Sequence, residues 1–388
     1  MNNSLIQLLF ALLRSVICGN QMSEQEKSLY SNEILPELVA ISKKHDLVHL
    51  LAVALDKNAL VENKNHDLSR HILTAVYRCE QKNYELGKIC EALEKAEIPF
   101  IALKGSVLRK YYPEPWMRTS CDIDILVNKI EVEKAATYLV DNCGYSREGK
   151  GSHDISLFSQ NKAHIELHYD LVEDGLINKS SEVLKSVWDI AIIQEPYKYW
   201  CKMPDEMFYF YHVAHMTKHF ENGGCGIRPF IDLWILDNIE GINQSDRDEL
   251  LKRGGLLNFV EVARRLSKVW FDNAEHDDIT KQMEQYILRG GVYGTSENRI
   301  TIQQQKKGGR LKYALSKIFI PYDIIKFHYQ ILQKHRWLTP FMEVRRWFKL
   351  IFCGHARRTM RELKYNNNIS YSEAENTQSF LKNIGLYL

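Results

Sequence analysis

Strand-type hydrophobic patterning is confined to one short stretch of this chain, and helical patterning surrounds that stretch on both sides. Residues 1–95 place apolar side chains three or four positions apart, as in ILPELVAISKKHDLVHLLAVAL from Ile34, which is typical of amphipathic helices. At Ile98 the pattern changes to short apolar runs, and after Leu171 it becomes helical again. We therefore expect an α/β (α+β) fold, in which a mixed, mostly antiparallel sheet is flanked by N-terminal and C-terminal helical regions.

Within 98–171 the pattern predicts, in order, a strand, a brief helix, a strand, a longer helix and a β-hairpin. These segments are IPFIAL (98–103), SVLRKYY (106–112), CDIDILV (121–127), KIEVEKAATYLVDNCG (129–144) and the pair HDISLFS (153–159) with AHIELHYDL (163–171). Pro113 should end the first helix and Gly144 the second, because proline lacks an amide donor and glycine favours the left-handed C-cap.

The rest of the chain predicts helices and no further strand. One exception is GGVYGTSENRITIQQQKKGG (290–309), whose glycines and polar residues favour a loop. Roughly the last twenty residues are expected to be weakly ordered. The patterns divide the chain into an N-terminal helical region (1–95), a core with the strands (96–172), a helical domain (173–295) and a basic C-terminal helical region (296–388).

Composition is that of a soluble globular protein, with 45% hydrophobic and 26% charged residues. No uncharged apolar run reaches about 18 residues, so we expect no transmembrane span. The N-terminal SLIQLLFALLRSVIC is interrupted by Gln7 and Arg14, which favours an amphipathic helix over a secretory signal. The cysteines form no Cys-x-x-Cys pair. This argues against a structural zinc site and for reduced thiols in a cytoplasmic protein.

Positive charge is concentrated toward the C-terminus. Residues 301–364 hold 15 Lys and Arg against 3 Asp and Glu, whereas the net charge of the whole chain is +2. Such an asymmetry is compatible with an anionic partner, either a nucleic acid or a membrane surface. A solvated basic helical surface is the simpler interpretation.

Two aspartates lie one residue apart on the predicted strand 121–127. Residues two apart in a strand point to the same face, so Asp122 and Asp124 project together while Ile123 and Ile125 face the core. Two carboxylates this close repel each other, and each resists ionising. A divalent cation removes that penalty, and Mg²⁺ (or Mn²⁺) prefers carboxylate oxygens and substrate phosphates. The sequence therefore predicts a metal site, although an Asp-x-Asp strand alone is more often solvent-facing.

A third acid lies on the predicted strand 163–171, where Glu166 shares its face with His164 and His168. If this strand lies beside the first, three carboxylates meet, which suits a two-metal phosphoryl-transfer site. All three acids are then expected to be metal ligands and catalytic residues, with Asp124 or Glu166 nearest the acceptor hydroxyl. The histidines could orient the ligands or line the cleft, and a half-exposed strand explains them nearly as well.

A Lys-Gly-Ser turn precedes the first acidic strand. Gly105 lets the backbone approach a phosphate without a side-chain clash. Ser106 can begin a helix and offer a hydroxyl, with the first helical amides directed at an anion. Lys104 and Arg118 would add positive charge. These four residues form the predicted nucleotide-binding set.

A histidine-rich segment, YHVAHMTKH, lies on a predicted helix of the third region. His212, His215 and His219 follow at i, i+3 and i+7 and share one helix face. They either line the catalytic cleft or pack between helices, and a zinc site would need ligands from elsewhere. Arg228 and Asp232, four residues apart, either line the same cleft or pair with each other.

Taken together and in this order, Gly105-Ser106, Asp122-Ile-Asp124 and Glu166 resemble the DNA polymerase beta-like nucleotidyltransferase superfamily. The closer likeness is to a bacterial branch labelled uncharacterised nucleotidyltransferase. It rests on Leu103-Lys104-Gly105, Arg118, Glu166-Leu-His168, and the histidine-rich helix followed by RPFID. The sequence departs from this branch at Thr119-Ser120-Cys121, where the branch more often has small or glycine-containing residues.

The resemblance implies a nucleotidyltransferase-type sheet, Mg²⁺ (or Mn²⁺), and an NTP such as ATP as the substrate. Because all three acids are present, it implies a competent enzyme. It names no particular hydroxyl acceptor, which could be a small molecule, a protein or a tRNA. The alternative function is a non-catalytic nucleotide- or polyanion-binding module that uses the basic C-terminal region.

Overall fold

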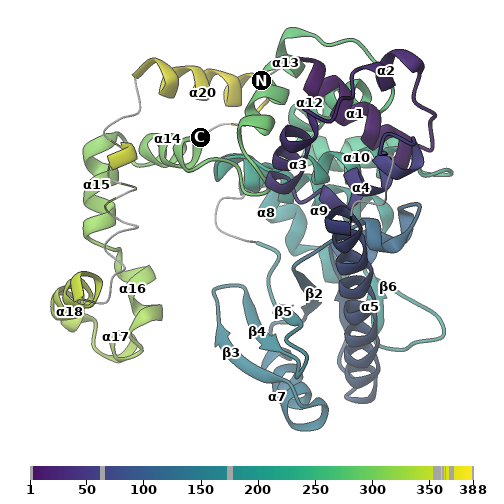
Figure 1. The fold of residues 1–388 in the computed structure, drawn as a ribbon. Helices are drawn as coiled ribbons and strands as arrows, with labels where there is room; N and C mark the ends of the chain where they lie inside the picture. The colour runs from purple at the N-terminus through teal and green to yellow at the C-terminus, as the bar shows by residue number, and fades with distance from the viewer. Residues whose placement is uncertain are drawn as a thin grey trace. The chain divides into compact units, whose positions relative to one another are not determined.

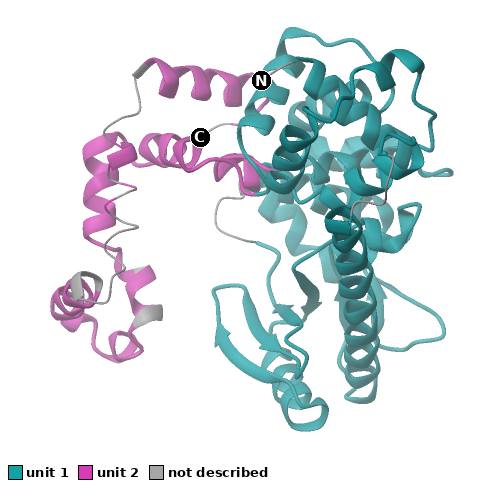
Figure 2. Ribbon diagram, viewed as in Figure 1, with its two compact units in different colours: residues 1–218, 226–292 teal, residues 219–225, 293–388 magenta. Residues whose placement is uncertain are grey.

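The computed structural model describes residues 3–61, 66–172, 178–352, 360, 362, 364–366 and 371–386 (Figure 1). The chain divides into two compact units (Figure 2). The first comprises residues 1–218 and 226–292, and the second comprises residues 219–225 and 293–388.

Helices make up the N-terminal part of the first unit, as the sequence predicts. They are α1 (Asn3–Ile17), α2 (Glu24–Ser28), α3 (Leu35–Lys44), α4 (Val48–Lys57) and α5 (His66–Lys95). Most of α1 is buried, since its apolar residues pack against α4 and against α12 (Leu257–Phe271). Within the described ranges, no helix is long and apolar enough to cross a membrane.

The sheet has seven strands in the order β3-β4-β5-β2-β1-β7-β6. Their bounds are β1 (Phe100–Ala102), β2 (Asp122–Val127), β3 (Ser146–Lys150), β4 (Asp154–Phe158), β5 (His164–His168), β6 (Ile192–Ile193) and β7 (Trp200–Lys202). β2 pairs in parallel with β5, and β1 with β7, whereas the other four pairings are antiparallel. The predicted mixed, mostly antiparallel sheet between helical regions is confirmed.

Three strands were not expected from the sequence. β6 and β7 follow Leu171, so the prediction that strands end there is wrong. These strands span only two and three residues, which is too short for a period-two pattern to emerge. β3, the sequence SREGK, is exposed along its whole length. A strand without a buried face leaves no hydrophobic signal.

One face of the sheet is covered by the second half of α5 and by α7 (Val132–Cys143). Alternate residues of the strands, such as Ile123, Ile125, Ile165 and Leu167, are fully buried in this core. α7 ends at Gly144, whose φ of 73° is left-handed, as predicted. The intervening residues of β2 and β5 therefore point to the opposite face, which carries the acids.

Helices follow the sheet in the first unit. They are α8 (Asn178–Lys185), α9 (Asp205–Glu221), α10 (Arg228–Asp237), α11 (Gln244–Arg253), α12 and α13 (Asp278–Arg289). The unit boundary falls within the last turn of α9, after Lys218.

The second unit is helical. Its helices are α14 (Ser296–Lys306), α15 (Arg310–Ile318), α16 (Tyr322–His328), α17 (Ile331–Lys334), α18 (Thr339–Phe352) and α20 (Tyr371–Asn383). Two predictions are corrected here, because 290–309 contains α14 and the C-terminal residues contain α20. Thr295 caps α14 by accepting from the amide of Asn298. Ile300, on α14, packs with Tyr313 in a small core.

Candidate metal and nucleotide site

The acids of the two predicted strands lie side by side. β2 and β5 are parallel neighbours, and their register sets Asp122 opposite His164 and Asp124 opposite Glu166. Because side chains alternate along each strand, these residues share the sheet face opposite the apolar core. The structure therefore brings Glu166 next to both aspartates.

Two overlapping groups of possible metal ligands result. Asp122, His164 and Glu166 have ligand atoms within 4.8 Å of one another, and so do Asp124, Glu166 and His168. Glu166 belongs to both groups. The histidines, expected behind the ligands, offer ring nitrogens at the same short range as the carboxylates.

Asp124 is the most tightly held of the acids. Its side chain is 2% exposed, and its Oδ1 lies 2.8 Å from Lys104 Nζ and 2.8 Å from His168 Nε2. His168 Nε2 is also 3.3 Å from Glu166 Oε2. A buried carboxylate that contacts an ammonium group and accepts a hydrogen bond from an imidazole stays ionised, which keeps its oxygens available as ligands.

The pKa values of the neighbouring acids move in opposite directions. Burial alone would raise the pKa of Asp124, but the Lys104 charge and the His168 hydrogen bond hold it well below its usual range. Burial and the Asp124 charge raise the pKa of Asp122, with Lys104 opposing them. The hydrogen bond from His168 lowers the pKa of Glu166. Such divergence between adjacent carboxyl groups is common at functional sites.

Lys104 reaches Asp124 from a tight turn between β1 and α6 (Gly105–Leu108). Its φ of 45° and ψ of −121° are those of the first central residue of a type II′ turn, where glycine is normally found. The turn is closed by Ser106 N donating to Leu103 O at 3.1 Å. The chain thus holds a lysine in a strained conformation at this position.

The structure shows what surrounds the Gly-Ser part of the turn, while its predicted role in phosphate binding stays a prediction. A Cβ on Gly105 would lie 3.1 Å from Ser120 Cβ, so the close approach of the Ser120 side chain favours glycine here. Ser106 Oγ is buried and has no hydrogen-bond partner among the described residues, so it can accept or donate to a bound group. However, the amides of Ser106 and Val107 already donate to Leu103 and Lys104 carbonyls, which leaves little for an anion.

Arg118 lies near this turn, but its positive charge is paired with a carboxylate of another helix. Its guanidinium makes a two-pronged ion pair with Asp232 on α10, at 2.7 and 2.8 Å. Tyr112 donates to the same carboxylate at 2.6 Å. Asp232 and Arg228 do not pair with each other, since Arg228 contacts Asp46 at 3.3 Å and Thr119 Oγ1 at 3.1 Å.

These contacts fix the segment that leads into β2, residues 117–120. His49 Nε2 lies 2.9 Å from the Met117 carbonyl, and Lys82 donates to the Ser120 carbonyl. On α10, Asp232 pairs with Arg118 and Arg228 donates to Thr119. We infer that the Arg–Asp motif positions the acidic strand.

The histidine face is only partly near the acids. His212 is buried and lies 3.1 Å from the Pro229 carbonyl, so it packs between α9 and α10. Burial lowers its pKa. The ring of His215 contacts that of Tyr211 at 6.4 Å. His219 belongs to the second unit.

Two residues of α9 that were not predicted from the sequence lie near the acids. The charges of Asp124 and Lys104 act on buried Tyr211, whose pKa burial raises. Burial and the Lys104 charge lower the pKa of Lys218 to about 8, while Glu166 and Asp124 oppose the shift. Tyr211 and Lys218 are seven residues apart and share a helix face. Only that helical spacing could have indicated Lys218 from the sequence.

The residues present fit a divalent cation. Carboxylate oxygens and imidazole nitrogens suit Mn²⁺, and the carboxylates suit Mg²⁺. The buried hydroxyl of Ser106, which has no hydrogen-bond partner among the described residues, is compatible with a phosphate nearby. Asp124 would then have to contact both Lys104 and the ion.

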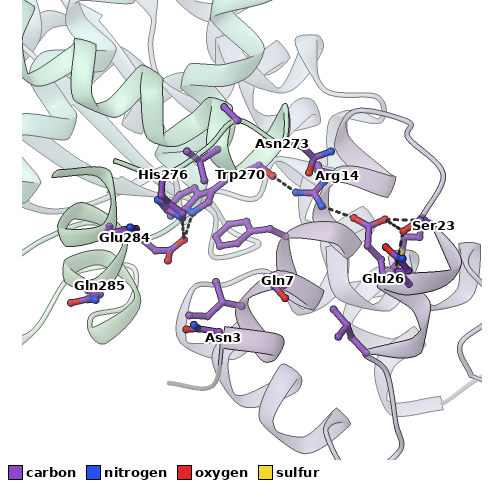
Figure 3. A pocket seen from close by; sticks show the side chains of 18 of the residues that line it. Asn3, Gln7, Arg14, Ser23, Glu26, Trp270, Asn273, His276, Glu284 and Gln285 are labelled. Atoms are coloured by element: carbon purple, nitrogen blue, oxygen red, sulfur yellow. Dashed lines mark hydrogen bonds and ion pairs between the residues drawn. The ribbon is translucent and has the colours of Figure 1, made fainter. Parts of the chain in front are cut away.

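A separate cavity of about 1180 Å³ lies in the first unit among α1, α2, α12 and α13 (Figure 3). Its polar groups largely satisfy one another. Arg14 donates to the Trp270 carbonyl at 3.0 Å and to Glu26 at 2.7 Å, and Trp270 Nε1 donates to Glu284 at 2.8 Å. None of the predicted site residues lines this cavity, so the carboxylate cluster remains the candidate site.

One known family matches the chain. The family described as "Uncharacterised nucleotidyltransferase" matches residues 33–272. That range contains all seven strands and both ligand groups. No curated protein and no solved structure is significantly similar to the chain.

Proposed function

The chain belongs to this family of uncharacterised nucleotidyltransferases, and from that premise we propose that it is a metal-dependent enzyme of the polymerase beta-like type. It moves a nucleoside monophosphate from an NTP to a hydroxyl acceptor. The acceptor hydroxyl gives up its proton to solvent as its oxygen forms a bond to the α-phosphorus. The bond from that phosphorus to the oxygen that bridges to the β-phosphate breaks, and pyrophosphate leaves. The observation that carries the proposal is the register that sets Asp124 opposite Glu166.

The acids would hold the metal. Asp122, Asp124 and Glu166, with His164 beside them, would bind Mg²⁺ or Mn²⁺. His168, whose Nε2 contacts Asp124 and Glu166, would orient them. When bound, such an ion supplies positive charge that activates the hydroxyl and neutralises the leaving pyrophosphate.

Other side chains would bind the nucleotide and keep the acids charged. Lys104 and His168 hold Asp124 ionised. Ser106 offers its hydroxyl to a phosphate oxygen, and Lys218 offers an ammonium near the acids. Glu166 is 24% exposed against 2% for Asp124, so Glu166 is the acid that an acceptor hydroxyl can approach.

The experiment is a transfer assay that does not require the acceptor to be known. Each of four α-labelled NTPs is incubated with Mg²⁺, the full chain and a cell extract, and labelled products are identified by mass spectrometry. Asp122→Ala with Asp124→Ala should lower transfer by on the order of 100-fold or more. The matched control is Asp141→Asn, an exposed acid on α7, which should transfer at the wild-type rate.

The alternative, a non-catalytic nucleotide- or polyanion-binding module, makes a different prediction. Binding would then survive loss of both aspartates, and no NTP would yield pyrophosphate. Undiminished transfer in the double variant would refute the assignment of the acids.

A further inference from the structure

Helices of the second unit expose large apolar side chains beside basic ones. Trp337 is 69% exposed, Phe341 is 64% exposed and Val344 is 55% exposed. A contiguous patch of large exposed apolar side chains usually marks a surface that binds a partner.

α18 exposes some of its apolar side chains and buries an acid. Phe341 and Val344 point outward, whereas Glu343 between them is only 8% exposed. Glu343 accepts from the Ile320 amide at 2.7 Å and pairs with Arg346 at 2.8 Å. A helix that only covered a core would place its apolar stripe inward and its acid outward.

Trp337 extends this outward stripe. It precedes α18 in a 3-10 helix (Arg336–Leu338) and meets Phe341 edge-on, with ring centroids 6.4 Å apart. Exposed Arg345 and Lys349 flank the apolar residues on the same helix. We call Trp337, Phe341, Val344, Arg345 and Lys349 the α18 stripe.

α15 repeats the arrangement. Leu311, Leu315 and Phe319 follow at four-residue spacing and are all exposed, whereas Tyr313 is 1% exposed and points inward. Exposed Lys312 lies next to Leu311.

The segment that contains α15 and the α18 stripe is positively charged. Residues 306–349 hold 11 Lys and Arg against 2 Asp and Glu. One of those acids, Glu343, is already paired with Arg346. A partner for this surface must therefore offer both an apolar layer and negative charge.

We propose that the α18 stripe, supported by α15, binds the surface of an anionic lipid membrane. Trp337 and Phe341 would enter the boundary between headgroups and acyl chains, where aromatic rings are favoured, and Arg345 and Lys349 would contact anionic headgroups. A nucleic acid would use the basic residues but not the aliphatic ones, since Leu311 and Val344 neither stack on bases nor donate hydrogen bonds. The proposal is independent of nucleotidyl transfer.

The test is sedimentation of the full chain with vesicles of equal parts phosphatidylglycerol and phosphatidylcholine, and with phosphatidylcholine alone. We expect binding to the anionic vesicles at least ten-fold tighter than to the neutral ones. Trp337→Ser with Phe341→Ser should weaken it at least about ten-fold, and Arg345→Gln with Lys349→Gln about 25-fold. The matched control is Ile130→Ser in the first unit, where Ile130 is 88% exposed.

All of these substitutions are at exposed positions, and circular dichroism would establish that each variant is folded. Equal binding to neutral and anionic vesicles, or undiminished binding of both double variants, would overturn the proposal. So would binding of single-stranded RNA without vesicle binding, or a dimer that Trp337→Ser with Phe341→Ser dissociates in the absence of vesicle binding.

Discussion

Basic side chains lie close to the acids of β2 and β5. Asp124 has two close partners, Lys104 and His168, at 2.8 Å each, and Glu166 lies 3.3 Å from His168. Lys218 adds a further positive charge whose pKa burial and Lys104 lower to about 8. A lysine poised in this way changes its charge near neutral pH.

Nucleotide binding should therefore weaken at alkaline pH. Below about pH 8 Lys218 is protonated and would attract the triphosphate of the proposed substrate, and above that pH the free protein loses this charge. We expect the affinity for Mg²⁺–NTP, measured by calorimetry, to fall between pH 7 and pH 9. Lys218→Arg should abolish this fall because arginine stays charged, and Lys218→Met should bind about ten-fold more weakly at pH 7. An identical fall in wild type and Lys218→Arg would contradict the role.

His45, at the end of α3, has no hydrogen-bond partner for either ring nitrogen among the described residues and is fully buried. Burial lowers its pKa to about 4 from 6.5. As the pH falls below 6.5, His45 becomes protonated in the unfolded chain. In the folded chain it stays neutral until about pH 4. Folding stability should therefore fall across that window, by about 3 kcal/mol.

His45→Leu removes this dependence. Urea unfolding at several pH values should show a flatter stability curve between pH 6.5 and pH 4 than in wild type. The exposed His71→Leu serves as the control. A wild-type slope in His45→Leu would show that other groups cause the acid sensitivity.

At the scale of elements, the turn before α6 stores strain at Lys104. Its φ of 45° favours glycine over any residue with a Cβ. Lys104→Gly and Lys104→Ala both remove the ammonium from Asp124, so their difference reports the backbone alone. We expect the glycine variant to be more stable to urea by about 1–2 kcal/mol.

The same pair of substitutions at Lys110, in a 3-10 helix (Arg109–Tyr111), provides the control. There alanine should be the more stable of the two, by about 0.5–1 kcal/mol. An alanine advantage at Lys104 as well would mean that the turn carries no such strain.

The buried pair of Arg118 and Asp232 links α10 to the segment before β2. Asp232→Ala would leave Arg118 and Tyr112 without their partner in a buried position, and we expect a loss of about 3–5 kcal/mol in urea unfolding. Glu133, which pairs with Arg147 on the surface, is the matched control, because Glu133→Ala should cost less than about 1 kcal/mol. Equal losses of unfolding free energy in the two variants would show that the buried pair stabilises the fold no more than the surface pair does.

Elements with a clear period were predictable and others were not. β2, β5 and α7 each bury one face, so their residues alternate or repeat in a way that the sequence reveals. β3 has no buried face, and β7 is defined by pairing with β1, which lies about a hundred residues earlier. α14 resembled a loop because its polar residues outnumber the few that pack, Ile300 among them.

The acidic cluster was predictable where the acids repeat along a strand. Asp122, Asp124 and Glu166 could be placed on common faces from period two, and β-sheet pairing then brought them together. Lys218 carries no such pattern, since a single lysine on a helix is ordinarily solvated. The partners of Arg118 and Arg228 depend on tertiary packing, so the sequence left their roles open.

At the scale of the whole molecule, the family match and the second unit account for different parts of the chain. The match ends at residue 272, and α14 to α20 lie beyond it. The family therefore informs the acidic site, whereas the basic helices need their own explanation.

The main proposal is that the paired acids hold a metal that binds the nucleotide. It is tested most directly by calorimetric binding of an α,β-methylene NTP analogue, with and without Mg²⁺, to the full chain. Asp122→Asn with Asp124→Asn is compared with the exposed control Asp141→Asn. Binding that requires Mg²⁺ in wild type and in the control, and that is at least about 100-fold weaker in the double variant, is the predicted result. Equal affinity in all three proteins, or binding that does not depend on Mg²⁺, would contradict it.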